Sequence, residues 1–170
     1  IAGGATALGV LYGNLDRFSF GGRATFRDLT YGPHAADSLG MTLDVPNPRL
    51  LDTMTVRAVA SAVHVFDRPL DTLAVRWERR DAANSSLDLH ARRDSTVDLQ
   101  ANAELDWSAT AKRVRLDRFD VLFGRRRLTL QDTARIEQDS AGFSASGVNL
   151  VSGDGALIEF GGVVPDSGQA

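Results

Sequence analysis

Apolar and polar residues alternate along most of this chain, and the pattern is clearest between Val114 and Val164. Short alternating runs there are separated by turn-forming residues, namely Gly124-Arg125, Gly142 and Ser152-Gly153-Asp154-Gly155. A period of two over short runs, interrupted by Gly, Asp and Ser, is typical of half-buried antiparallel strands. The stretch therefore predicts four or five strands joined as a meander, with one apolar and one polar face.

Residues 5–45 have the same alternation. Gly21-Gly22 and Gly32-Pro33 are turn signals, so we expect the chain to reverse at both. Leu39 to Val45 alternates cleanly, and Pro46-Asn47-Pro48 should end that strand because proline cannot donate a ladder hydrogen bond.

Residues 50–66 fit two patterns, since their apolar positions match both a helical stripe and a strand face. Their Thr and Val content favours the strand, and the helix stays open as the alternative. Further strands are predicted around Leu73–Trp77, Leu87–Leu89 and Val97–Leu105, with a turn at 81–84. The whole chain then has roughly a dozen short strands and little helix, which is an all-β protein.

Composition limits the classes of function. The 170 residues, 43% of them hydrophobic and 24% charged, suit one folded domain. The net charge is −3, from 19 basic and 22 acidic residues that are well mixed, so we expect no nucleic-acid partner. Lys112 is the only lysine, and we infer no function from it. The absence of cysteine excludes disulfides and cysteine-built zinc sites.

The ends of the sequence suggest a piece of a longer protein. The sequence begins at Ile1 without a Met start or a charged n-region, so no signal peptide is visible in it, and no apolar run approaches the ~18 residues of a membrane-spanning helix. An anchor or signal is expected outside this segment. The tetrapeptide Leu15–Phe18 (LDRF) recurs as Leu116–Phe119, 101 residues later (116 − 15). We therefore expect residues 1–170 to be one segment of a repeat-type β protein, with sub-repeats over 1–100 and 101–170.

A search for catalytic chemistry finds none. His34, His64 and His90 lie far apart without metal-ligand spacing. Residues 142–147 resemble a nucleophile elbow, but the closing glycine is one place late and no helix is predicted after it. Residues 153–155 lack the further ligands of a calcium or phosphate loop and favour a hairpin turn. We therefore expect no catalytic residue, no metal, no cofactor and no enzymatic activity.

Three other features have plain structural interpretations. Arg125-Arg126-Arg127 could bind phosphate or lipid headgroups, but a solvated hairpin tip is favoured. Asn84-Ser85-Ser86 is a glycosylation sequon that we expect to be only a loop. Trp77 and Trp107 are expected to pack in the core or at an edge.

The C-terminal stretch resembles the repeats of TamB/AsmA-like envelope proteins. In that family a strand of the type L-x-x-F-x-V-x-x-G leads into a short apolar strand, as at Leu116–Gly124 here. A small-residue stretch follows, here 132–134, and then a strand and the pattern V-x-L-x-S-G-D-G. Residues 148–161 match that last part closely. The resemblance covers the last third of the chain well and the rest loosely.

The resemblance implies a fold, a location and partners. The fold would be an elongated antiparallel meander, curved into an open groove with a greasy interior (a β-taco). The protein would span the periplasm, anchored in the inner membrane by a part outside this segment. Its partners would be phospholipid acyl chains and an outer-membrane β-barrel partner or client, and its roles phospholipid transport and outer-membrane protein assembly.

Alternation predicts which residues would line such a groove. The expected inward-facing residues are Val121, Phe123, Leu128, Leu130, Ile136, Phe143, Val148, Leu150, Ile158 and Phe160. The same residues could instead form the packed core of a structural or adhesive β-sandwich without a lipid role. A third possibility is an open sheet edge that donates a strand to outer-membrane clients.

Overall fold

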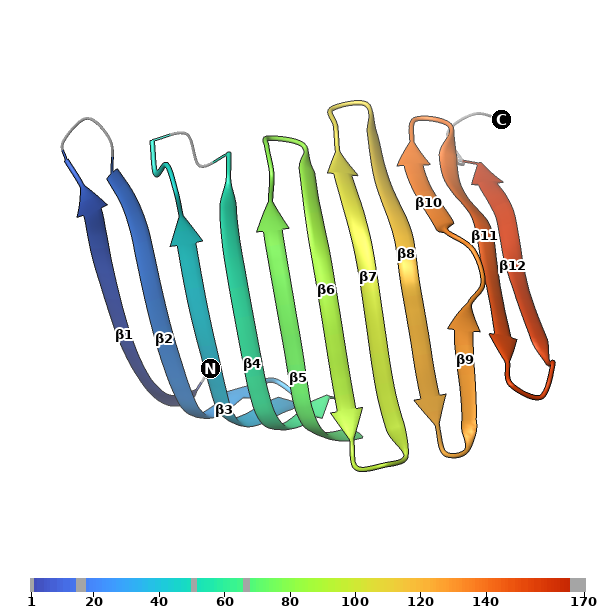
Figure 1. The fold of residues 1–170 in the computed structure, drawn as a ribbon, viewed down its shortest axis with the longest axis horizontal. Coiled ribbons are helices and arrows are strands. Elements are labelled where there is room, and N and C mark those ends of the chain that lie inside the picture. The colour runs from blue at the N-terminus through green and yellow to red at the C-terminus, as the bar shows by residue number, and fades with distance from the viewer. Residues whose placement is uncertain (1, 15–17, 50–51, 66–67, 166–170) are drawn as a thin grey trace.

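The computed structural model of this chain describes residues 2–14, 18–49, 52–65 and 68–165. Within these ranges the protein consists of twelve strands and no helix, and all strands belong to one antiparallel sheet (Figure 1). The predicted all-β meander is therefore confirmed.

Most strands are long. Their bounds are β1 (Ala2–Gly13), β2 (Phe18–Tyr31), β3 (His34–Val45), β4 (Met54–Val65), β5 (Arg68–Arg79), β6 (Asn84–Arg93), β7 (Val97–Trp107), β8 (Ala111–Phe123), β9 (Arg126–Leu130), β10 (Ala134–Asp139), β11 (Gly142–Ser152) and β12 (Leu157–Pro165). The expectation of short strands is wrong for all but β9 and β10. The expected strands were short because glycines and irregular positions interrupt the alternation. In the structure these positions lie inside longer strands and do not end them.

Strand order follows the sequence from β1 to β8 and from β10 to β12. β9 and β10 together fill one place in the sheet, because both pair with β8 on one side and with β11 on the other. The break between them falls at residues 131–133 (Figure 1). Residue 100 lies inside β7, so the expected boundary between sub-repeats falls within a strand; the division itself stays a prediction.

The sheet is a single layer. A folded monomer of 18.3 kDa exposes about 8,100 Å² by the usual scaling with mass. This chain exposes 11,551 Å². The buried apolar residues are mostly alanines, and no large described side chain is fully buried. The sandwich alternative requires a second sheet packed on the first. The described residues form no such second sheet.

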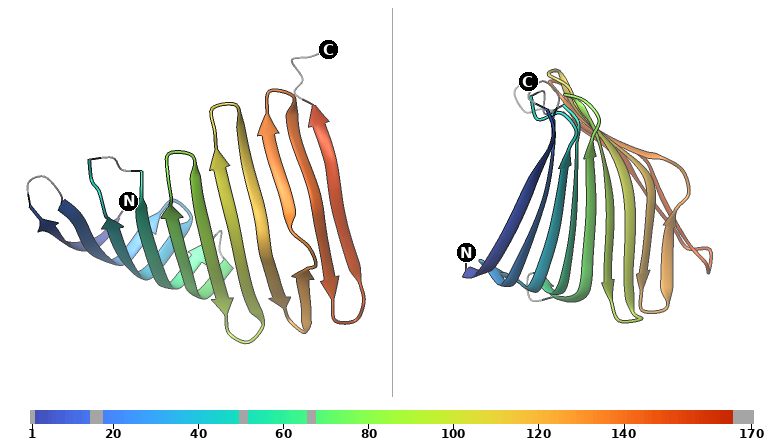
Figure 2. Two further views of the ribbon diagram at one scale, coloured as in Figure 1. Left: turned by 45° about the horizontal axis from the view of Figure 1, so that its top comes forward. Right: turned by 60° about the vertical axis from the view of Figure 1, so that its left-hand side comes forward.

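A crease crosses the first five strands near their lower ends. Gly3, Asp28 and Ala62 have positive φ of 135°, 52° and 47°, and the ladders skip the pairings at Asp28, Asp37, Ala62 and Asp71. Ala60 and Val63 pack into one small core with Ala36, although they are three positions apart, an odd spacing that places residues of a regular strand on opposite faces. Alternation thus changes phase at the crease, and the strands bend there (Figures 1 and 2).

The ambiguous stretch 50–66 is a strand where it is described, since β4 covers Met54–Val65 and pairs on both sides. Residues 50, 51 and 66 lie outside the described residues. The strand that the Thr and Val content favoured is confirmed for these residues, and the helix alternative is wrong there.

The predicted turn at Gly21-Gly22 is wrong. Both glycines lie in the middle of β2 and pair with β1 and β3. A Cβ on Gly9 or Gly22 would lie 2.7 Å or 3.2 Å from the ring of Phe20, so this ring covers both glycines. An aromatic ring over strand glycines restores the packing that their missing side chains would provide.

Other predicted boundaries are confirmed. The chain turns at Gly32-Pro33, at Gly124-Arg125 and in the loop after Ser152, and β3 ends at Val45 before Pro46. The first copy of the LDRF repeat lies mostly in residues 15–17, outside the described residues.

Candidate functional site: the apolar face

One face of the sheet can be followed from strand to strand by its ladder pairs, because directly opposed residues point to the same side. A single row across the sheet runs through Ala7, Ala24, Met41, Ala58, Val75, Leu89, Ala101 and Phe119. Every member of the row is apolar. We call the side that holds this row the apolar face, and the other side the polar face.

Acidic residues are segregated between the two faces. The strand ladders place these ten on the polar face: Asp44, Glu78, Asp88, Asp98, Glu104, Asp106, Asp120, Glu137, Asp139 and Glu159. None of the ladder-paired residues on the apolar face is acidic. Its charged residues above the crease are four cations, Arg79, Arg93, Lys112 and Arg126, and each lies at a strand end.

Two irregularities keep this face continuous across β8 to β12. In β8 the pairing with β7 shifts at Asp117, so that Leu116 and Phe119 both stay on the apolar face. In β11 the pairing with β12 shifts between Ala145 and Val148, and Gly147 between them has φ of 72°. Without these bulges, the next residues of each strand would point to the other side.

The structure places all ten predicted groove residues on the apolar face. Ladder pairs join Val121 to Leu128, Leu130 to Leu150, and Leu150 to Ile158. Leu130 is buried, whereas the exposed members are Phe123, Phe143, Ile158 and Phe160. The register of the strands places all ten side chains on the same face. Their role in holding lipid stays a prediction.

The apolar face is hollowed at a place that the predicted list did not include. A hollow of about 410 Å³ lies over β1 to β4, with Phe20, Phe26, Met41, Leu43 and Val56 in its lining. The alternation of residues 5–45 indicated an apolar strand face in this region. The ten predicted groove residues, however, all lie in the C-terminal stretch that resembles the TamB/AsmA-like repeats.

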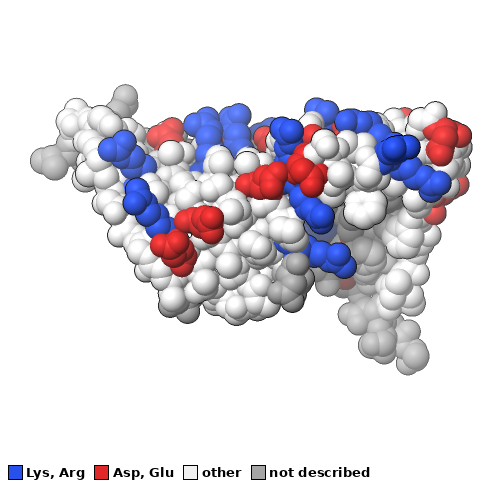
Figure 3. Space-filling view, turned by 90° about the horizontal axis from the view of Figure 1, so that it is seen from below, with Lys and Arg blue, Asp and Glu red and all other residues white. Residues whose placement is uncertain are grey.

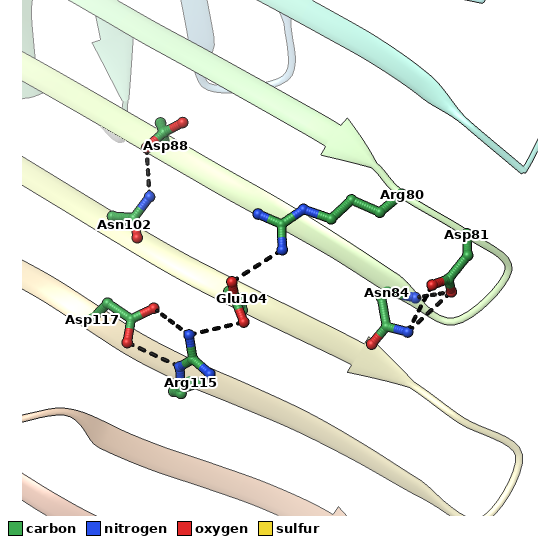
Figure 4. A network of polar contacts seen from close by, with 8 residues as sticks. All are labelled: Arg80, Asp81, Asn84, Asp88, Asn102, Glu104, Arg115 and Asp117. Atoms are coloured by element: carbon green, nitrogen blue, oxygen red, sulfur yellow. Dashed lines mark hydrogen bonds and ion pairs between the residues drawn. The ribbon is translucent and has the colours of Figure 1, made fainter.

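The polar face is held by exposed ion pairs and amide contacts (Figure 4). Arg115 contacts Glu104 at 2.9 Å and Asp117 at 2.9 Å, and Glu104 also accepts a hydrogen bond from Arg80 at 3.1 Å. Hydrogen bonding to Asp117 raises the pKa of Arg115. Seen from below, charged side chains lie together in places and leave large uncharged areas between them (Figure 3).

Asp120 is the most enclosed acid of the ion pairs, with a side chain 13% exposed. The Arg118 guanidinium donates a hydrogen bond to it at 2.7 Å, and the Thr129 hydroxyl donates another at 2.8 Å. These hydrogen bonds, with that of Arg118 the larger, lower the pKa of Asp120.

Three of the candidate chemical features can be placed in the described parts of the chain. His90 contacts Asp98 at 3.2 Å, and no three His, Asp or Glu side chains of the described residues form a metal-binding group. Residues 142–147 lie in β11, which no helix follows. Asp154 lies in the hairpin loop, where its hydrogen bond from Ser152 is the main cause of its lowered pKa.

Comparison with known proteins identifies no relative: no protein-family model, no curated protein and no solved structure matches this chain. Nor does any described helix have the length and hydrophobicity to cross a bilayer.

Proposed function

We propose that this chain provides a track for the acyl chains of phospholipids on its apolar face. The observation that supports the proposal is that this face continues over β1 to β12 with no acid among its ladder-paired residues and without a covering layer from the described residues. Each CH₂ group removed from water contributes about 0.8 kcal/mol, so hydrocarbon binds to such a surface without specific polar contacts.

The cellular setting of the proposal comes from the resemblance of residues 148–161 to TamB/AsmA-like repeats. That resemblance supports a location in the periplasm, within a protein anchored in the inner membrane by another part. There it would bridge the two membranes, moving phospholipids toward the outer membrane and assisting outer-membrane protein assembly with a β-barrel partner.

The test compares two neighbouring residues of β6 that point to opposite faces. Leu89 lies on the apolar face and His90 on the polar face. The chain and its Leu89→Glu and His90→Glu variants are titrated with a fluorescent fatty acid, with circular dichroism to verify the fold. We expect binding by the wild type and His90→Glu, and a loss of about tenfold in Leu89→Glu, because a carboxylate would have to be desolvated beneath the chain. Absence of binding by the wild type, or equal loss in both variants, would contradict the track.

Strand donation remains a second candidate, favoured by the two sheet edges. β1 has no charged residue and β12 has only Glu159, and both strands are exposed along their whole length. Natural edge strands are usually blocked by charges, prolines or bulges in their middle. A photo-crosslinker at Val10 or Val163 should capture an unfolded outer-membrane protein, whereas one at Ala101, in the sheet centre, should not. Equal capture at all three positions would exclude pairing at the edges.

A further inference from the structure

The cations of the apolar face lie at its margins. Arg79 is the last residue of β5, and Lys112 is the second residue of β8. Both are at the upper end of the sheet in Figure 1, where β3, β5 and β7 finish. Arg93 and Arg126 lie at the lower end, at the end of β6 and the start of β9. Between these margins, no ladder-paired residue of the face is charged.

Both tryptophans of the chain accompany the upper cations. Trp77 lies two residues before Arg79 on the same side of β5, and Trp107 is the ladder partner of Lys112. We call these four residues the upper rim. At the same end of the sheet, the Arg49 guanidinium lies 5.8 Å from the ring centre of Phe18. Tryptophan beside lysine or arginine is the composition found where proteins meet the boundary between hydrocarbon and headgroups.

The four cations differ in their neighbours. The Lys112 ammonium makes no hydrogen bond or ion pair with a described residue, and Arg79 donates to the backbone carbonyls of Asp81 and Ala82, at 3.0 Å and 3.2 Å. At the lower margin, Arg93 contacts the Asp94 carboxylate at 3.8 Å.

Resting on the proposed acyl-chain track, we propose that its occupants are anionic phospholipids, with their phosphate groups at the upper rim and their tails over the apolar face. Charge complementarity supports this occupant, since the ladder-paired residues of the face include cations at its margins and no carboxylate that could hold the amine of a zwitterionic headgroup. Trp77 and Trp107 mark the level at which the headgroup meets the tails. The Lys112 ammonium reaches out of the apolar surface to the phosphate, as long cationic side chains do at membrane interfaces.

Two fluorescent phospholipids with the same tails test the headgroup preference of the whole chain. Phosphatidylglycerol is anionic and phosphatidylcholine is zwitterionic, so we expect the wild type to prefer phosphatidylglycerol. Lys112→Gln should weaken phosphatidylglycerol binding about fivefold, the usual effect of one cation near an anionic lipid surface, and leave phosphatidylcholine unchanged. Lys112→Arg should retain the preference, and Arg57→Gln on the polar face should match the wild type.

The outcomes separate this inference from the proposed function. Equal binding of the two lipids by the wild type would overturn the headgroup assignment and leave the track intact. An equal loss of both lipids in Lys112→Gln would overturn it as well. If neither lipid binds to the wild type, the track itself is absent.

A second measurement tests the orientation of the lipid. In a Trp77→Phe variant, Trp107 is the only tryptophan, and it is 49% exposed. We expect its fluorescence to be quenched more by a phospholipid spin-labelled next to the headgroup than by one labelled at the tail terminus. Stronger quenching by the tail label would overturn the placement of headgroups at the upper rim.

Discussion

The two faces of the sheet differ in what their side chains contact. On the apolar face the ladder-paired residues are mostly Leu, Val, Phe, Ala and Gly, with no acid among them and with cations only at the margins. On the polar face, basic and acidic side chains alternate across the strands and pair, as Arg113 does with Asp106 and Glu137. Charge pairs between exposed groups contribute little to stability. We therefore expect the apolar face, more than these ion pairs, to determine the register and stability of the sheet.

The largest expected difference between the faces is in the free energy of unfolding that an aspartate substitution costs, and it is expected at two neighbouring residues of β4. Ala60 is 7% exposed in the crease core, whereas Val59, on the polar face, is 55% exposed. Ala60→Asp would bury an unpaired carboxylate and should lower the free energy of unfolding by about 3 kcal/mol. Val59→Asp should lower it by about 1 kcal/mol at most, through lost strand preference. Urea unfolding of both variants measures this, and equal losses would show that the crease core does not stabilise the sheet.

A smaller loss is expected where a bulge keeps the apolar face continuous. Gly147 has φ of 72°, and a Cβ there would lie 2.7 Å from the carbonyl oxygen of Thr133. Gly147→Ala should therefore lower the free energy of unfolding by about 2 kcal/mol. Gly155 is the matched control, because its φ is 83° but no atom lies within 4 Å of its Cβ position. Gly155→Ala should lose only about 1 kcal/mol, and thermal unfolding that ranks the two in reverse would contradict the close approach in β11.

The pH dependence of stability should arise from the polar face. Arg118 and Thr129 lower the pKa of Asp120 in the folded protein. The ionised form is thus favoured by folding, and its contribution is complete above the ordinary aspartate pKa of about 3.9 and declines as the pH falls below that value. Asp120→Asn should remove this contribution, about 0.5 kcal/mol at neutral pH, and flatten the curve of unfolding midpoint against pH between pH 5 and pH 3. An unchanged curve would show that the hydrogen bonds do not favour the carboxylate.

The smallest effect is expected for the exposed network in Figure 4. Arg115 has a side chain 47% exposed, although it contacts two carboxylates. Arg115→Gln should change the free energy of unfolding by about 0.5 kcal/mol or less, and salt should reduce the difference further. A loss comparable to that of Ala60→Asp in denaturant unfolding would mean that the polar face, too, determines the fold.

Alternation in the sequence was sufficient to predict the fold class and the shared face of the ten candidate residues. It was sufficient because a period of two places every second side chain on one side, whatever the strand pairs with. It misplaced the turn at Gly21-Gly22, since a glycine that an aromatic ring covers cannot be told from a turn glycine until the ring is placed. The phase change at Asp28 and Ala62 was also missed, because alanine does not signal a positive φ and a single Asp, which tolerates one, occurs at many other positions of the alternating runs.

The candidate site was predicted only in part for a similar reason. Trp77 is far from Trp107 and Lys112 in the sequence, and Trp107 and Lys112 become direct ladder partners through the register of β7 and β8. From the sequence we expected the tryptophans to be packing residues and inferred no function from Lys112. The hollow over β1 to β4 needs Phe20 from β2 beside Met41 from β3 and Val56 from β4, which no local pattern specifies.

The order of strands in this single layer has a consequence for how the chain acquires its structure. Nearly every strand pairs with its sequence neighbour, so each hairpin can add to the growing edge as soon as it is synthesised. Loops of low contact order close quickly, and nucleation can begin at any hairpin and propagate in both directions. Unfolding should then begin at the two edges of the sheet. Amide hydrogens of the edge strands β1 and β12 should exchange first, and those of the central strands β6 and β7 last.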